Sequence, residues 1–237
     1  MSAIGDAITW INDPLNWTNP DGILVRLREH LLISAAAVGL ACVVAWPLGL
    51  WMGHVGRGGG VAVTLANITR AIPVVALLTI FPLTFIGFGY PAIVIALAIF
   101  AIPPLLATAY LGIREVDPEV REAATGMGLS GRQLLGKIEL PLAVPYLASG
   151  FRTAAVQVLA TATLAAFVNG GGLGMIISRG FGLGRVAGAG QILVGGFLVA
   201  VLCLLAEGVL ALAERAVTPR ALRMRAKMSE PAASITP

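Results

Sequence analysis

The chain has 237 residues, of which 57% are hydrophobic and only 12% are charged, and its mean hydropathy is +0.89. Soluble domains carry about 25% charged residues, so this composition excludes a soluble globular protein and predicts an all-α integral membrane protein. The net charge of +4 does not call for nucleic acid as a partner, because membrane proteins gather Lys and Arg on their cytoplasmic side. The two cysteines and two histidines form no metal-ligand spacing, so no metal site is expected.

Residues 1–30 are polar and rich in turn signals, and they include Trp10 and Trp17. Because Trp favours the membrane–water interface, we expect an extracytoplasmic, interfacial N-terminal segment. A cleavable signal peptide is not expected, since a basic start followed by an apolar core is missing.

Residues 31–213 are expected to form the transmembrane domain. Runs of about 20 apolar residues cross a bilayer, and this criterion predicts about five spans, at 31–52, 61–81, 91–112, 143–167 and 190–213. The glycines at 53–60 are not followed by Gly-Lys-Ser/Thr, so they do not form a phosphate-binding loop and the chain has no ATP site of its own. The basic tail, 214–237, is expected to be disordered and cytoplasmic.

The loop at 114–141 is the longest charge-bearing stretch between hydrophobic runs and predicts two short helices. Asp117 is suited to N-cap the first helix, and Ser130 with Gln133 forms a capping box for the second. Pro141 is expected to end the second helix, because the residue before a proline is disfavoured in the α region. The first helix carries one apolar face, made of Val120, Ala123, Ala124 and Met127. A helical loop with an apolar face and exposed charges is typical of a docking element.

The distribution of basic residues predicts the orientation of the spans. If the N-terminus lies outside, the outer side holds Arg26, Arg28, Arg179 and Arg185. The cytoplasmic side then holds many more, namely Arg57, Arg114, Arg121, Arg132, Lys137, Arg215, Arg220, Arg223, Arg225 and Lys227. The central loop and the C-terminus are therefore expected in the cytoplasm.

The same loop resembles the cytoplasmic EAA loop of ABC importer permeases, in both spacing and residue type. The matching residues are Glu122, Ala123, Ala124, Gly128, Ile138, Leu140 and Pro141. The resemblance implies a coupling helix that fits a groove on an ATPase subunit, which would hold ATP and Mg, while this chain itself holds no cofactor. The alternative is an ordinary amphipathic loop that packs on its own bundle.

Further segments look like the compatible-solute branch of these permeases, namely 70–78, 140–145, 152–157 and 170–174. The resemblance implies a type I ABC importer permease fold in the bacterial cytoplasmic membrane. It also implies a second permease subunit, a separate extracytoplasmic solute-binding protein, and glycine betaine, choline, carnitine or proline as solute. The chain performs no bond chemistry in this interpretation, so no catalytic residue is expected.

Three alternatives to this function remain open from the residues. The first is import of another small amino-acid-like solute. The second is an ion-coupled secondary transporter, which calls for intramembrane carboxylates, whereas Glu207 is the only carboxylate in the apolar runs. The third is a membrane-embedded enzyme, for which the spans lack a His pair, a Ser/His/Asp set and an acidic cluster.

Polar residues within the predicted spans are pathway candidates, namely Asn67, Arg70, Gln157 and Thr161. Arg70 falls near the middle of its span, where it either attracts a solute carboxylate or binds backbone carbonyls or a neighbouring subunit. Arg152, nearer the cytoplasmic end, is expected to extend to the interface. A glycine-rich run after the fourth span predicts a hinge, gate or re-entrant loop, with Gly170, Gly171, Gly172 and Gly174 as candidates.

Overall fold

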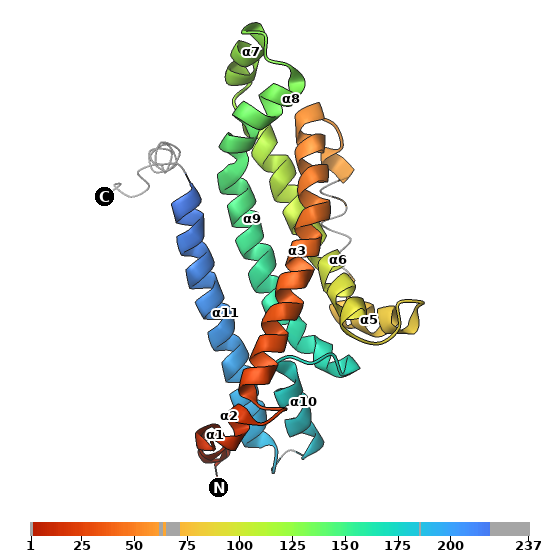
Figure 1. Cartoon of the computed structure of the whole chain (residues 1–237), viewed down its shortest axis with the longest axis vertical. Coiled ribbons are helices and arrows are strands. Elements are labelled where there is room, and N and C mark those ends of the chain that lie inside the picture. The colour runs from red at the N-terminus through yellow and green to blue at the C-terminus, as the bar shows by residue number, and fades with distance from the viewer. Residues whose placement is uncertain (1, 62–63, 65–71, 185, 219–237) are drawn as a thin grey trace, which may run out of the picture.

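The structure, a computed structural model, describes residues 2–61, 64, 72–184 and 186–218, and within these residues it contains helices and no strand (Figure 1). In chain order the helices are α1 (Ala3–Asn12), α2 (Leu15–Thr18), α3 (Ile23–Val55), α5 (Val74–Ile80), α6 (Tyr90–Arg114), α7 (Pro118–Gly126), α8 (Gly131–Leu134), α9 (Leu140–Thr161), α10 (Gly174–Gly182) and α11 (Ala189–Val217). Three further helical segments complete the set, namely the 3₁₀ turns Phe81–Leu83 and Ala162–Val168 and the π turn Leu135–Glu139.

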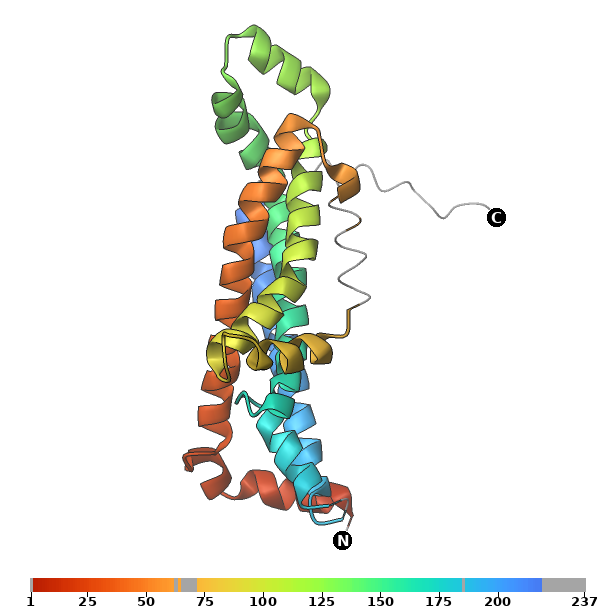
Figure 2. The same cartoon turned by 90° about the vertical axis from the view of Figure 1, so that its right-hand side faces the viewer.

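Four stretches of the described chain are long and apolar enough to cross a membrane, namely Leu15–Val55, Tyr90–Arg114, Gly131–Val168 and Ala189–Val217. They coincide with four of the predicted spans. The remaining predicted span, 61–81, lies largely outside the described residues. Its described end is α5, which runs across the long axis of the molecule rather than along it (Figure 2).

Helices α3, α6 and α9 form the core of the bundle, and small residues let their backbones approach closely. A Cβ atom added at Gly53 of α3 would lie 2.7 Å from the Cβ of Ile113 in α6. One added at Gly150 of α9 would lie 2.0 Å from the hydroxyl of Thr108, also in α6. Close backbone approach replaces the hydrophobic driving force that is missing between helices in lipid, so these glycines fix how the three helices pack.

Helix α3 begins at Ile23, earlier than the start at residue 31 predicted from hydropathy. Its first turns carry two buried polar residues: Arg26, which bonds to nearby Asp21 and Glu29, and His30, which bonds to Leu159 in a distant helix. Polar residues therefore extend this helix instead of ending it, because their side chains find partners within the protein.

Helix α11 lies beside α9 and leaves much of its apolar surface uncovered (Figure 1). Its exposed large side chains include Leu193, Phe197, Leu204, Leu205, Val209 and Leu212. The two short helices α7 and α8 lie at one end of the bundle, and α1, α2 and α10 lie at the other (Figure 1). The long helices thus join two ends of the bundle, each of which carries its own set of short helices.

Candidate functional site: a coupling loop and a pinned glycine loop

The capping residues of the central loop adopt the predicted roles. The carboxylate of Asp117 accepts a hydrogen bond from the backbone N–H of Glu119 at 3.0 Å and caps α7. Ser130 and Gln133 form the predicted capping box at the start of α8. Gly128 has a φ of +86°, a left-handed conformation that only glycine adopts without strain, so it allows the sharp turn between the two helices.

The prediction that Pro141 ends the second helix is wrong. The chain continues from α8 through the π turn Leu135–Glu139 directly into α9, and these elements form one candidate span, Gly131–Val168. A proline removes one N–H and clashes with the carbonyl four residues earlier. The N–H of Leu140 reaches back to the carbonyl of Leu135, a five-residue step that widens the helix just before the proline. The loop is therefore continuous with a membrane-spanning helix.

A buried carboxylate, Glu139, joins α7 to the rest of the bundle. Its side chain is fully buried, with 0% exposure, and it contacts two cationic or ionisable groups. One oxygen lies 2.6 Å from a guanidinium nitrogen of Arg121 in α7, and the other lies 2.6 Å from Nδ1 of His54 at the end of α3. Arg121 also donates to the backbone carbonyl of His54 at 3.3 Å. These three residues, which we call the inner anchor, hold α7 against the ends of α3 and α9.

Sequence reasoning missed the inner anchor. His54 and Glu139 are 85 positions apart, so no local spacing reveals their contact. The available signal was a single carboxylate between apolar Ile138 and Leu140, a position that the EAA-loop pattern treats as variable.

The face of α7 predicted to be apolar is mostly open. Ala124 is buried, whereas Ala123 is exposed and Val120 and Met127 are 41% and 74% exposed. A surface depression of about 400 Å³ lies on the other side of α7, lined by Arg121, Glu122, Thr125 and Gly126 and by Leu134 of α8. The exposed residues of the apolar face are therefore open to a partner, and the depression is a separate feature of the same short helix.

The matched EAA-loop residues have different environments. Glu122, Ala123, Gly128 and Pro141 are exposed, Ile138 and Leu140 are half-buried, and Ala124 is buried. Their coupling role remains a prediction, although the exposed members are available to a partner.

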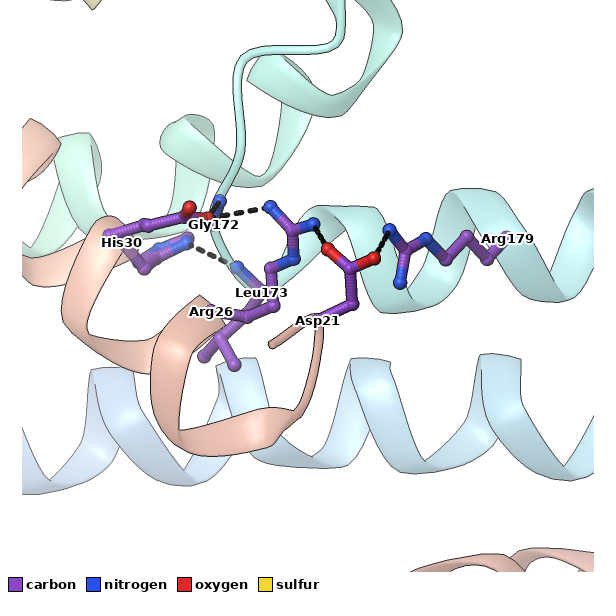
Figure 3. Close-up of polar contacts among 7 residues, drawn as sticks. Asp21, Arg26, His30, Gly172, Leu173 and Arg179 are labelled. Atoms are coloured by element: carbon purple, nitrogen blue, oxygen red, sulfur yellow. Dashed lines mark hydrogen bonds and ion pairs between the residues drawn. The ribbon is translucent and has the colours of Figure 1, made fainter. Parts of the chain in front are cut away.

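The glycine-rich loop lies at the opposite end of the bundle, where two side chains of α3 hold its backbone (Figure 3). Glu29 accepts a hydrogen bond from the N–H of Gly172 at 2.9 Å, and Nδ1 of His30 accepts one from the N–H of Leu173 at 3.2 Å. The other ring nitrogen of His30 lies 2.8 Å from the carbonyl of Leu159 and donates to it. His30 thus acts as the neutral tautomer with its proton on Nε2.

An ion-pair chain ties the same loop to its neighbours. Arg26 pairs with Glu29 at 2.8 Å and also with Asp21, whose second oxygen lies 2.9 Å from Arg179 of α10 (Figure 3). We call Asp21, Arg26, Glu29, His30 and Arg179 the outer latch. It connects the start of α3, the glycine loop and α10.

Each of the four candidate hinge glycines meets a steric requirement. Gly171 and Gly172 have φ angles of +80° and +76°. A Cβ atom would lie 2.3 Å from Ile93 at Gly170 and 2.0 Å from a backbone carbonyl at Gly174. Glycine is therefore needed here to shape the loop, and movement of the loop stays a prediction.

The pathway candidates are only partly described. Asn67 and Arg70 lie outside the described residues. Gln157 is exposed near the C-terminal end of α9, while the hydroxyl of Thr161 donates to the backbone carbonyl of Gln157. An exposed amide on a membrane-spanning helix faces a cavity or another subunit rather than lipid, so Gln157 remains a candidate.

Arg152 pairs with carboxylates of α11, and its extension to the membrane interface stays a prediction. Its guanidinium lies 2.9 Å from Glu214 and 3.4 Å from Glu207 of α11. These ion pairs satisfy its charge within the bundle.

The helices and their two ends define the class of this protein, which is a multi-pass, all-α membrane protein with an exposed helical loop continuous with one of its spans. The family described as "Binding-protein-dependent transport system inner membrane component" matches residues 45–219. The chain belongs to this family.

Relatives support the same assignment along most of the chain. The glycine betaine/carnitine/choline transport system permease protein OpuCB of Bacillus subtilis is 35% identical over 87% of this chain and 93% of its own length. The choline transport system permease protein OpuBB of the same bacterium is 34% identical, with 90% and 96% covered. The carnitine transport permease protein OpuCD of Listeria monocytogenes is 35% identical, with 85% and 89% covered.

An inward-facing structure of the MetNI methionine ABC transporter superposes with a TM-score of 0.73, covering 88% of this chain and 100% of that chain at 24% identity. At this identity the likeness shows the fold alone, and the fold is that of a type I ABC importer permease. Together with the family, it sets aside the secondary transporter and the membrane enzyme, so the chain is a transport permease subunit and not itself an enzyme.

Proposed function

We propose that the chain is the permease subunit of an ATP-driven importer of compatible solutes such as glycine betaine, choline, carnitine or proline. The observation that carries the transport role is the inner anchor, which joins an exposed docking helix to two membrane-spanning helices. The solute class rests on relatives whose names include glycine betaine, carnitine and choline.

The partners follow from the exposed surfaces and from the family. A separate ATPase subunit binds α7 and holds ATP and Mg, since this chain has no phosphate-binding loop. A second permease subunit, identical or homologous, covers part of the exposed apolar surface of α11. A solute-binding protein docks at the end that carries α1, α2 and α10.

In this proposal the central loop and the C-terminus lie in the cytoplasm of a bacterial cell and the N-terminus lies outside, as the distribution of basic residues predicts. Within this frame transport proceeds by alternating access. Closure of the two ATPases moves each α7, and the inner anchor passes this movement to α3 and α9, whose reorientation opens the path inward.

Uptake of labelled solutes tests the proposed function. Cells that express the permease with its ATPase and binding protein are expected to accumulate betaine, choline, carnitine or proline. Cells with the same system but an ATPase that cannot hydrolyse ATP are the control. Uptake of another small amino-acid-like solute, with none of these four, would establish the alternative substrate class.

A further inference from the structure

A cavity of about 370 Å³, open to the surface of the bundle, lies between α3, α9 and α11. It occupies the half of the bundle that carries the central loop, where α11 leans away from α9 (Figure 1). Its lining is almost wholly apolar apart from Arg152 and Glu214. Binding pockets for small molecules are typically about 300–1,000 Å³ and mostly apolar with a few polar groups, so its size and lining suit a small solute.

Two aromatic rings contribute to the wall of this cavity. Trp46 of α3 and Phe151 of α9 have ring centroids 6.2 Å apart and planes tilted by 45°. The indole N–H of Trp46 is buried and has no hydrogen-bond partner among the described residues. Aromatic faces attract cations that have lost their water, and a free N–H favours an acceptor such as a hydroxyl or carboxylate oxygen.

The charges beside the cavity leave an excess of negative charge. Arg152 pairs with both Glu214 and Glu207. Two carboxylates against one guanidinium leave one negative charge uncompensated when all three are ionised. A cation is therefore favoured over an anion at this position.

We propose that this cavity binds the trimethylammonium group of the solute on its way to the cytoplasmic side. The inference rests on the proposed function, because betaine, choline and carnitine each carry this group. Its methyl groups match the apolar lining, its positive charge matches the carboxylates, and its weak hydration suits the aromatic faces. A metal cation does not fit, because it needs several oxygen ligands that an apolar lining does not provide.

The first test uses a reporter cysteine at Ala213, which lines the cavity on α11. The variant Ala213→Cys is made in a Cys42→Ala, Cys203→Ala background and purified in nanodiscs with its ATPase but without a binding protein. Its reaction with an uncharged thiol reagent is measured with choline or with 3,3-dimethylbutanol, the neutral carbon isostere of choline. Choline is expected to slow the reaction about tenfold while the isostere leaves it unchanged. Equal slowing by both probes, or no slowing by choline, would overturn the proposal, and the latter result would fit a cavity that lipid fills.

The second test separates ring chemistry from volume. Trp46→Phe keeps an aromatic face, whereas Trp46→Leu keeps an apolar side chain without one. The choline concentration that gives half-protection is expected to rise less than threefold in the first variant and about tenfold in the second. Equal values in the two variants would exclude the aromatic contact.

Failure of the inference and failure of the proposed function are distinguishable. A complete system that imports choline, although choline does not protect Ala213→Cys, overturns the cavity assignment alone. An assembled system that imports none of the four solutes overturns the proposed function. Binding in the cavity is still decided by comparing protection of Ala213→Cys by choline and by 3,3-dimethylbutanol.

Discussion

Replacement of Glu139 by Gln tests the inner anchor directly. The change keeps the side-chain volume and removes the charge from a carboxylate that is fully buried between Arg121 and His54. Removing one partner of a buried ion pair costs about 3–5 kcal/mol. Gln still accepts one hydrogen bond, and the Arg121 side chain is 19% exposed and reaches water, so we expect a loss of about 2 kcal/mol for the docked position of α7. Since 1.4 kcal/mol is a factor of ten, the undocked population of α7 should rise about 30-fold.

Two measurements check this expectation on the assembled importer. Hydrogen exchange should become faster for the amides of α7 and stay unchanged for those of α6, which serves as an internal reference for global folding. The number of ATP molecules hydrolysed per solute imported should rise several-fold, because α7 no longer carries ATPase movement into the spans. Glu115→Gln is the matched control, since Glu115 is exposed and forms no ion pair within the described part of the chain. Unchanged exchange in α7 together with unchanged coupling in Glu139→Gln would refute the anchor.

Three further predictions address other parts of the chain. Gly128→Val places a branched side chain at a φ of +86°, which costs about 1–2 kcal/mol. The variant should co-purify less ATPase while its spans still insert, and normal ATPase binding would show that the turn tolerates the strain. A cysteine at Ser130 should react with membrane-impermeant thiol reagents only from the cytoplasm and one at Asn12 only from outside, and the reverse pattern would overturn the orientation. Arg70→Gln should lower betaine or carnitine uptake more than choline uptake, because choline lacks a carboxylate, whereas equal losses would indicate a structural arginine.

Local chemistry explains which parts of the central loop were predictable. Caps act over two or three residues, so Asp117 and the pair Ser130 and Gln133 could be identified from spacing alone. The end of the second helix could not be predicted, because the local rule for Pro141 does not include the π turn that precedes it. Capping patterns therefore predicted where the two loop helices begin, whereas the proline rule wrongly predicted that the second helix ends before the membrane domain.

Long-range contacts were outside the reach of the sequence pattern. The bonds from Glu29 to Gly172 and from His30 to Leu173 each join residues 143 positions apart. The glycine run itself was recognisable from composition, but which side chains hold it depends on how α3 packs beside the loop. Hydropathy also placed the start of α3 too late, because it scores His30 as polar without regard to its partners.

The inner anchor and the outer latch share one element, which is helix α3. It has 33 residues, or about 50 Å at 1.5 Å per residue, with Glu29 and His30 near one end and His54 near the other. Its glycine-mediated contacts with α6, at Gly49 and Gly53, lie near the His54 end. Pro47 lies inside α3 between these two ends, and a proline inside a helix removes one backbone hydrogen bond and weakens the helix at that point. The inner anchor and the glycine loop are thus joined by one helix, α3, with Pro47 between them.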